Sequence, residues 1–282
     1  MGRKQEQEII KLLDKHTHRV LSPIEFTKFW EQAHKIYGFM SMSKSILSEY
    51  LQGKGILKTI EEDSKNFFPI YGIEKKKPDI LDYAAAYSRS SYFSHYTAVS
   101  IHNLTLQIPK HIYMTNERKK YIRYNSQMTQ ENIDKAFSKQ PRQTSNNRNL
   151  SRYSIHLING QANKNLGVIP YKDDLFVTDL ERTLIDITAR PFYAGGVTQV
   201  LEAFINAKEN LDIEKMISYY KKMHFAYPYH QAIGFYLEKA EYPQESIAPF
   251  LQMEQCFKFY LSYNIRFKEF SPRWNLYYPR GV

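Results

Sequence analysis

The sequence predicts an α+β protein with an N-terminal winged helix-turn-helix domain followed by a larger mixed α/β C-terminal domain. Three amphipathic helical segments precede a hairpin pattern within the first 77 residues. A charged run that ends in proline follows at 74–79, and beyond it strand-like and helical patterns mix without a regular βαβ alternation. We therefore predict a winged helix-turn-helix DNA-binding domain over 1–77 and a second domain over 78–282.

The first two helices are indicated by apolar periodicity and by capping residues. Residues 4–16 place Ile9, Ile10, Leu12 and Leu13 on one broad apolar face. Residues 22–37 begin with Ser22 as N-cap, Pro23 at the first helical position and Glu25 in the position that completes a capping box. Both segments therefore have the features of helices that pack on a common core.

The third helix and the hairpin complete the first domain. Residues 41–55 predict a helix that ends at Gly53 and buries Ile46, Leu47, Tyr50 and Leu51. Residues 56–60 and 66–73 predict two short strands, with the polar segment 61–65 as the tip between them. Three helices followed by such a hairpin is the order of elements in a winged helix-turn-helix domain.

The outer face of the third helix supplies the candidate DNA contacts. In the winged-helix geometry this helix enters the major groove, and the hairpin lies on the DNA backbone. Small hydroxyl side chains allow a close approach to the groove, and a lysine reaches a phosphate or a guanine edge. The candidate contacts are Ser43, Lys44, Ser45 and Ser48 on the helix, Lys58 and Lys65 on the wing, and Arg3 and Lys4 as a basic arm. Winged helices also dock onto proteins, so a protein-docking module remains an alternative.

Positive charge is concentrated in the first half of the chain. The net charge is +10; residues 1–77 carry 14 Lys+Arg against 10 Asp+Glu, residues 78–152 carry 11 against 5, and residues 153–282 carry 14 against 14. All of the excess therefore precedes residue 153. A segregated basic surface favours a polyanionic partner, nucleic acid before an anionic membrane.

The second domain combines short strands with helices. Residues 79–91 predict a helix, 92–104 a short strand that leads into a helix, 110–116 a strand, and 129–137 a capped helix. Residues 139–152 predict a polar, basic loop, and residues 153–158, 166–171 and 175–178 predict strands. Helices follow over 178–189, 197–210, 212–224, 229–239 and 244–254, and the apolar segments 257–264 and 273–279 predict closing strands.

The stretch VTDLERTLIDITARPFYAGG (177–196) raises the question of catalysis because it is rich in carboxylates. Thr178 and Glu181 have the spacing of a capping box, and Asp179 in the first turn favours the helix dipole. Arg182 and Asp186 are an i,i+4 pair. We therefore interpret these charges as architectural. The alternative is a metal-dependent nuclease that uses Asp173, Asp174, Asp179 and Glu181, although the lysine that commonly accompanies such carboxylates is absent two residues after Glu181. NTP hydrolysis is not indicated, because the sequence has no phosphate-binding glycine loop ending in Lys-Ser/Thr.

Cofactor and metal chemistry are not indicated by the remaining residues. The pairs His16/His18 and His95/His102 have no cysteines beside them, and we interpret them as packing or surface residues. The single cysteine, Cys256, lies among apolar residues and is predicted to be buried in the core. The sequence has no run long enough to span a membrane and no hydrophobic signal region at its start, so we expect a cytoplasmic protein without catalytic residues, metal or cofactor.

Two blocks of the second domain resemble the AbiEi-type antitoxins of type IV toxin–antitoxin (abortive infection) systems. They are YFSHYTAVSIHNLTLQIPKHIYMTNERKK (92–120) and LFVTDLERTLIDITARPFYAGG (175–196). The first resembles the family's Ser-His, His-x-Leu-Thr and Ile-Pro elements, and the second its Asp-x-Glu-Arg-Thr-Leu-x-Asp, Arg-Pro and Ala-Gly-Gly elements. The residues that carry the resemblance are Ser94, His95, His102, Thr178, Asp179, Glu181, Arg182, Asp186, Arg190, Pro191, Gly195 and Gly196.

The resemblance implies a non-enzymatic phage-defence protein with two tasks. The N-terminal domain would bind inverted repeats in double-stranded DNA at the promoter of its own operon and repress transcription. The C-terminal domain would counteract a nucleotidyltransferase toxin without a stable complex. Palindromic operators call for two copies of the protein, either as a monomer in solution that pairs on DNA or as copies that pair beforehand. The basic run Arg118, Lys119, Lys120 and Arg123 is a candidate nucleic-acid-facing patch, with a solvated edge as the alternative interpretation.

Overall fold

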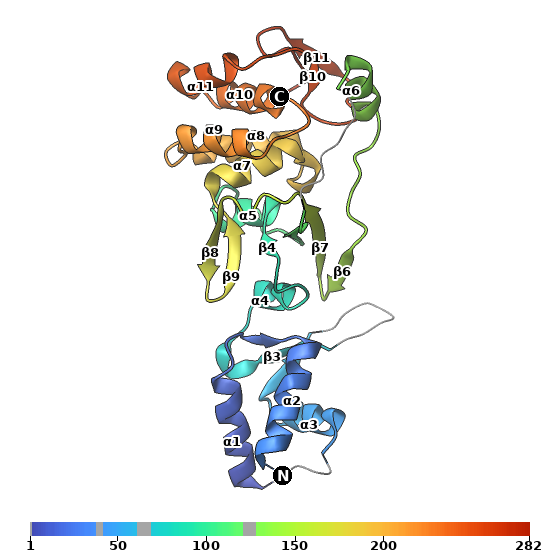
Figure 1. Cartoon of the computed structure of the whole chain (residues 1–282), viewed down its shortest axis with the longest axis vertical. Coiled ribbons are helices and arrows are strands. Elements are labelled where there is room, and N and C mark those ends of the chain that lie inside the picture. The colour runs from blue at the N-terminus through green and yellow to red at the C-terminus, as the bar shows by residue number, and fades with distance from the viewer. Residues whose placement is uncertain (1, 38–41, 61–68, 121–127) are drawn as a thin grey trace. The chain divides into compact units, whose positions relative to one another are not determined.

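Two compact units make up the chain in the computed structural model, which describes residues 2–37, 42–60, 69–120 and 128–282. The first unit consists of Met1–Ser91, Asn147–Ile155 and Pro170–Leu175, and the second of Tyr92–Asn146, His156–Ile169 and Phe176–Val282. Figure 1 traces both units and labels their helices and most of their strands. The first unit therefore includes two short segments from the second half of the sequence.

Three helices and a small antiparallel sheet form the N-terminal part of the first unit. The helices are α1 (Arg3–Asp14), α2 (Pro23–Tyr37) and α3 (Lys44–Gly53), and the strands are β1 (Val20–Leu21), β2 (Leu57–Thr59) and β3 (Tyr71–Ile73). The strand order is β1-β3-β2, and β3 is antiparallel to both neighbours. The predicted winged-helix arrangement is confirmed, and β1 is a strand that the sequence pattern did not reveal.

The core of this part joins all three helices to the sheet. Apolar side chains spaced three and four residues apart on each helix point to the same side, where they meet the buried side chains of the strands. The buried residues are Ile9, Leu13, Leu21, Phe26, Phe29, Ala33, Leu47, Leu51, Leu57, Tyr71 and Ile73. Removing one such aliphatic side chain costs about 2–5 kcal/mol in typical cores, so each of the buried aliphatic residues contributes to holding the three helices together.

A 3₁₀ turn (Glu74–Lys76) and the short helix α4 (Ile80–Ala85) complete the described first 91 residues. The helix ends before the predicted residue 91, because the N–H groups of Ala86, Tyr87 and Ser88 bond to carbonyls three residues back, which tightens the last turn. Tyr83 of this helix lies against Gly72 of β3. A Cβ atom at Gly72 would come within 2.0 Å of the Tyr83 hydroxyl oxygen, so the contact requires glycine.

A mixed six-stranded sheet has the strand order β6-β7-β5-β4-β9-β8, and most of its residues belong to the second unit. Strand β4 is antiparallel to β5 and parallel to β9. The strands are β4 (Tyr92–Phe93), β5 (His111–Glu117), β6 (Asn147–Leu150), β7 (Tyr153–Gly160), β8 (Val168–Lys172) and β9 (Leu175–Thr178). Strand β6 lies within the segment that the sequence pattern predicted as a loop.

Helices pack together beside this sheet (Figure 1). They are α5 (His95–Ile101), α6 (Gln130–Phe137), α7 (Leu180–Ala189), α8 (Val197–Ala207), α9 (Ile213–Lys222), α10 (Tyr229–Lys239) and α11 (Gln244–Leu251). Helix α7 is central, because it contacts α5, α8, α9 and α10. A second small sheet, β10 (Phe259–Tyr260), β12 (Leu276–Pro279) and β11 (Lys268–Ser271), contains one parallel and one antiparallel pair.

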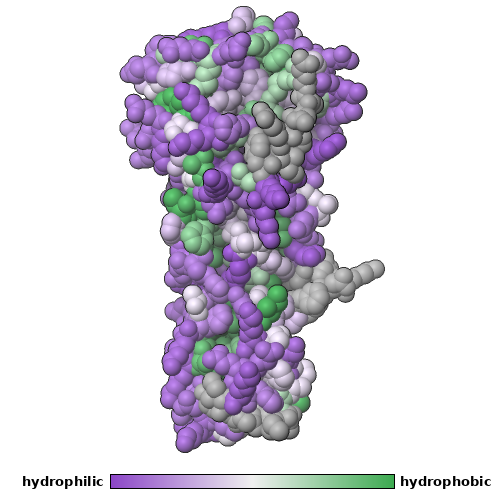
Figure 2. Space-filling view, viewed as in Figure 1, coloured by the Kyte–Doolittle hydropathy of each residue, from purple (hydrophilic) through white to green (hydrophobic). Residues whose placement is uncertain are grey.

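The surface of the molecule is mostly hydrophilic on the face shown in Figure 2, where apolar residues are scattered in small groups. Apolar residues gather instead in the core of the second unit, where Phe204, Tyr236, Phe250 and Trp274 are buried. Among the residues that the structure describes, no helix has both the length and the apolar character that crossing a membrane requires.

Candidate nucleic-acid interface

The N-terminal end of α3 presents its polar side chains at the surface. Lys44 and Ser45 are exposed, and the Lys44 ammonium group donates to the Thr27 hydroxyl at 3.3 Å. Ser43 is the N-cap of the helix, and its Oγ accepts the backbone N–H of Ile46 at 3.3 Å. Lys44 and Ser45 are therefore the predicted contacts that lie exposed at this end of the helix, with the Ser45 hydroxyl 2.9 Å from the Ser43 hydroxyl. The Ser43 hydroxyl also satisfies the helix end.

The prediction that Ser48 lies on the outer face is wrong. Ser48 is buried, and its hydroxyl donates to the carbonyl oxygen of Ser45 at 2.9 Å. Ile46, which was predicted to be buried, is 52% exposed. Leu47 and Leu51 decide the orientation, because their burial, four residues apart, places Ser48 beside the core and turns Ile46 outward.

The remaining predicted DNA contacts of the first domain lie on α1, on β2 and outside the described residues. Arg3 and Lys4 are exposed and lie in the first turn of α1, so they belong to a helix and not to an extended arm, and their contact with DNA stays a prediction. Lys58 is exposed on β2, and its backbone carbonyl accepts the hydroxyl of Tyr83 at 3.3 Å. Lys65 lies outside the described residues. The described cations available to a polyanion thus include Lys44 and Lys58.

Helix α2 is anchored at its start by a partly buried carboxylate. Glu25 Oε2 accepts the backbone N–H of Ser22 at 2.7 Å and Ser22 Oγ accepts that of Glu25 at 3.3 Å, so the predicted capping box is present. Arg89 also binds both carboxylate oxygens, at 2.9 and 2.8 Å, and donates to the carbonyl of Val20 at 2.6 Å. Burial raises the pKa of Glu25, but these bonds prevail and lower it to about 2.

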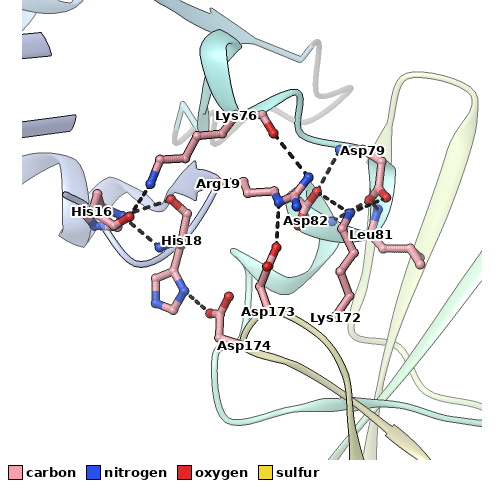
Figure 3. Close-up of polar contacts among 10 residues, drawn as sticks. All are labelled: His16, His18, Arg19, Lys76, Asp79, Leu81, Asp82, Lys172, Asp173 and Asp174. Carbon is pink, nitrogen blue, oxygen red and sulfur yellow. Dashed lines mark hydrogen bonds and ion pairs between the residues drawn. The ribbon is translucent and has the colours of Figure 1, made fainter. Parts of the chain in front are cut away.

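A second set of ion pairs ties the segment Pro170–Leu175 to the N-terminal part of the first unit (Figure 3). Arg19 Nε donates to Asp173 Oδ2 at 2.6 Å, and His18 contacts Asp174. The Lys172 ammonium group lies 2.8 Å from Asp79 and 3.2 Å from Asp82.

These contacts shift the pKa of the two aspartates in opposite directions. Burial raises the pKa of both, but the hydrogen bond to Lys172 leaves Asp79 with a lowered pKa. Asp82, which lies beside Asp79, keeps a raised pKa. Asp82 Oδ2 also accepts the backbone N–H of Asp79 at 2.8 Å, so it is part of the capping box of α4 as well as of the ion-pair set.

The four carboxylates of the nuclease alternative are engaged separately. Asp173 and Asp174 pair with Arg19 and His18 in the first unit, and Asp179 and Glu181 share a lysine in the second. Across the described ranges, no group of three or more His, Cys, Asp or Glu side chains has an arrangement that could hold a metal ion. The geometry therefore does not favour a metal centre at these carboxylates.

The N-terminus of α7 differs from its predicted capping. Asp179, and not Thr178, is the N-cap, and its Oδ1 accepts the backbone N–H of Arg182 at 3.0 Å. Thr178 instead shares a hydrogen bond with Thr183 at 2.8 Å. Glu181 is not part of a capping box, because its Oε1 accepts the backbone N–H at the start of α9 (3.1 Å) and its Oε2 lies 2.7 Å from Lys215.

Arg182 is the centre of a buried polar network in the second unit. Its side chain is 4% exposed and reaches Asp186 at 2.9 Å, Glu117 at 3.9 Å and the carbonyl of Leu166 at 2.6 Å. Burial alone would lower the pKa of Arg182, but Asp186 and the other acceptors raise it, so the guanidinium stays charged. These contacts link α7 to β5 and to the loop before β8, which is a structural role.

The remaining residues of the two blocks also shape the backbone. Ser94 Oγ bonds to His95 Nδ1 at 2.9 Å and to the Thr115 hydroxyl at 2.7 Å, and His102 Nε2 lies 2.6 Å from the carbonyl of Thr178. Burial lowers the pKa of His95 well below its ordinary value, so this imidazole is neutral at pH 7. The turn before α8 contains Arg190, Pro191, Gly195 (φ 80°) and Gly196 (φ 98°).

A solved structure, that of the RV2827C protein from Mycobacterium tuberculosis, is similar to this chain. The two share 12% sequence identity with a TM-score of 0.59, over 99% of this chain and 92% of that one. This likeness shows a common fold over nearly the whole length. No protein-family model matches the sequence, and no curated protein matches it.

The basic run after β5 is described in part. Arg118, Lys119 and Lys120 are exposed, and Arg123 lies outside the described residues.

Cys256 is exposed, so the prediction of a buried cysteine is wrong. It follows the end of α11, where the chain leaves the core before β10. Cys256 follows the polar residues Glu254 and Gln255 and precedes Phe257, so the apolar segment that begins at Phe257 made the prediction of burial misleading.

The sequence pattern did not identify the charged residues whose ion-pair partners are distant in the chain. Arg89 is isolated in a polar segment, Lys172 looks like an exposed strand residue, and Lys215 lies on the charged side of an amphipathic helix. Each meets its carboxylates only after folding, over separations of 64 residues for Arg89–Glu25 and 93 for Lys172–Asp79. The sequence pattern carried no signal for these pairs.

Proposed function

We propose that this protein is a non-enzymatic antitoxin of a type IV toxin–antitoxin system that also represses its own operon by binding upstream DNA. DNA binding rests on one observation, the exposed N-terminal end of α3 with Lys44 and Ser45 in a winged-helix unit. The antitoxin role rests on the resemblance of residues 92–120 and 175–196 to AbiEi-type proteins. The target of the second domain is then a nucleotidyltransferase toxin, in the cytoplasm.

The geometry of α3 refines how DNA would be read. Lys44 supplies a phosphate or guanine contact, Ser45 permits close approach, and the exposed Ile46 offers an apolar contact to a thymine methyl group. Lys58 on β2 supplies a backbone contact for the wing. Inverted repeats would be read by two copies of the protein, which pair on the DNA.

The first experiment titrates the full chain onto a labelled duplex of its own upstream region and onto a scrambled duplex, at two salt concentrations. We expect preferential binding whose log–log salt slope is about −0.9 for each phosphate contact. Lys44→Ala weakens binding to the upstream duplex, and the matched control Lys11→Ala, on the exposed side of α1, leaves it unchanged. Equal affinity for both duplexes, or a Lys44→Ala variant that binds like the wild type, contradicts operator recognition.

A salt-independent affinity for a protein instead of DNA would support the docking alternative. The exposed Ile46 on α3 is the observation that favours it. Ile46→Ser then abolishes protein capture, whereas under DNA recognition it changes only the preference at one base pair.

The antitoxin role is tested by growth. Co-expression with a cognate nucleotidyltransferase toxin restores growth, and it does so with Lys44→Ala as well, because repression and antitoxicity lie in different domains. Incubation of the protein with DNA or RNA and Mg²⁺ yields no cleavage products. Growth arrest that persists beside the wild-type protein contradicts the antitoxin role, and Mg²⁺-dependent cleavage contradicts the non-enzymatic assignment.

A further inference from the structure

The second unit contains a cavity of about 680 Å³ that has no part in the proposed DNA recognition. It lies among the start of α5, the ends of β5 and β7, the α7 side chains from Arg182 to Arg190, and the loop between α9 and α10. Pockets that bind metabolites and cofactors typically have volumes of about 300–1,000 Å³. The cavity is thus large enough to enclose one small ligand.

The charge of the cavity wall is strongly positive. Among the described lining residues, Arg118, Arg142, Arg182 and Arg190 face a single acidic residue, Asp186. Asp186 is engaged by Arg182 at 2.9 Å, and within the described part of the chain the other three arginines form no ion pair. Guanidinium groups match the planar geometry of phosphate oxygens and bind them through two parallel hydrogen bonds.

Arg190 is close enough to three rings at the cavity to influence their pKa values. Its positive charge adds to the effect of burial in lowering the pKa of His95, and it opposes the effect of burial on the pKa of Tyr229 and Tyr263. An arginine that is half-buried beside neutral rings is costly to desolvate without an anion. A phosphate group in the cavity would supply that anion.

Aromatic rings form the wall next to these arginines. The lining includes Phe225, Tyr227, Tyr229 and Tyr263. Phe225 and Tyr229 meet edge to face at 5.2 Å, and Tyr227 and Tyr229 meet at 6.1 Å. Aromatic side chains beside cationic groups are the combination with which proteins hold a nucleobase and its phosphate at once. A purely anionic ligand would not require this wall.

We propose that this cavity binds a single nucleotide, with its phosphate on Arg118, Arg142 and Arg190 and its base against the tyrosines. The same chemistry is present in a free nucleoside monophosphate and in an unpaired nucleotide of a single strand. Exposed Lys119 and Lys120 follow Arg118 directly, so positive charge continues along the chain beyond this cavity residue. This arrangement suits a strand, whose further phosphates lie outside the cavity.

The test uses the full chain and two kinds of probe. Calorimetric titration with each 5′-nucleoside monophosphate measures the free nucleotide, and fluorescence anisotropy with a labelled eight-nucleotide single-stranded RNA measures the strand. Arg190→Gln and Arg118→Gln each weaken binding about 10-fold or more, which corresponds to the loss of one charge-assisted hydrogen bond. Tyr227→Ala weakens it about 5-fold or more through lost base stacking.

Matched controls separate this site from other basic surfaces. Arg266→Gln removes an exposed arginine outside the cavity and changes affinity less than about 2-fold. Lys44→Ala leaves single-strand binding intact, because α3 is not part of the cavity. Arg118 is exposed, so its variant is expected to keep the wild-type fold, as checked by circular dichroism, even if Arg190→Gln does not.

Each outcome bears on the proposal. Tighter binding of the RNA identifies a strand, and equal binding of the monophosphate identifies a free nucleotide; both support it. Binding of neither probe, retained affinity in both arginine variants, loss on Lys44→Ala, or equal affinity for inorganic phosphate and nucleotide overturns it. Operator binding by the first unit would be unaffected by any of these failures, so the two proposals are tested separately.

Discussion

The Glu25–Arg89 pair offers a direct test of how the first unit is held together. The Glu25 carboxylate is 18% exposed, caps α2 through Ser22 and binds Arg89 with both oxygens. Glu25→Gln keeps the size of the side chain and one acceptor oxygen but removes the charge. Arg89 is then left half-buried without its carboxylate, while the rest of the core is unchanged.

The magnitude follows from the pKa of Glu25. A fall from the ordinary 4.5 to about 2 corresponds to roughly 3 kcal/mol of stability at pH 7. Because the folded-state pKa is the lower of the two, this stability is fully present above about pH 4.5 and is lost as the pH falls towards 2. We therefore expect Glu25→Gln to cost roughly 3 kcal/mol at pH 7, and about half of that at pH 3.

The measurement is urea unfolding at pH 7, 5, 4 and 3, followed through the fluorescence of Trp30 on α2, with Trp274 reporting the second unit. The matched control is Glu8→Gln, which removes an exposed pair with Lys11 and is expected to cost less than about 0.5 kcal/mol. The reasoning is refuted if the two variants lose the same stability at pH 7. It is also refuted if the cost of Glu25→Gln does not change between pH 7 and pH 3.

Three further predictions concern packing, the buried network and the cysteine. Gly72→Ala forces a Cβ within 2.0 Å of the Tyr83 hydroxyl and 2.9 Å of Pro78 Cγ and lowers the urea stability of the first unit by about 1–3 kcal/mol. Adding Tyr83→Ala removes the shorter of the two contacts, and an unchanged Gly72→Ala midpoint contradicts this. Arg182→Met leaves Asp186 and Glu117 buried without their cation, and we expect it to lower the urea stability of the second unit by about 3–5 kcal/mol. Lys215→Met, at a 40% exposed lysine, is expected to cost less. A larger loss of stability for Lys215→Met than for Arg182→Met argues against the network. Cys256 reacts with a disulfide-exchange reagent in the folded protein without a change in the urea midpoint, and protection until unfolding would show it to be buried.

Local features of the fold could be predicted because their causes lie within a few residues. The capping box of Ser22 and Glu25 and the N-cap of α6 at Thr129 require only a hydroxyl or carboxylate within three positions of a free N–H. The apolar periodicity of α7 and α10 likewise marks them as core helices. By contrast, the cap of α7 was assigned one residue too early, because Thr178 and Asp179 are both good caps and tertiary contacts decide between them.

Candidate contacts were predicted less well than elements. The side of α3 that faces outward depends on which apolar residues reach the core. The helix is rotated relative to the predicted orientation, so Ile46 is exposed and Ser48 is buried. Lys44 and Ser45 are exposed under either orientation, since they lie in the first turn. Arg142 lies in a polar segment and Arg190 follows the buried helix α7, and nothing in their neighbourhoods indicates that one cavity brings them together.

The sequence by itself determined the order of the elements apart from β1 and β6, the winged-helix pattern of the first 77 residues and the concentration of positive charge before residue 153. Backbone hydrogen bonds, helix caps and apolar periodicity act over a few residues, so the sequence expresses them directly. Only the tertiary structure decided which charges are neutralised, because Arg19 and Asp173 are 154 residues apart and meet at 2.6 Å. Electrostatic pairing depends on distance in space, and that distance is set by how the whole chain packs.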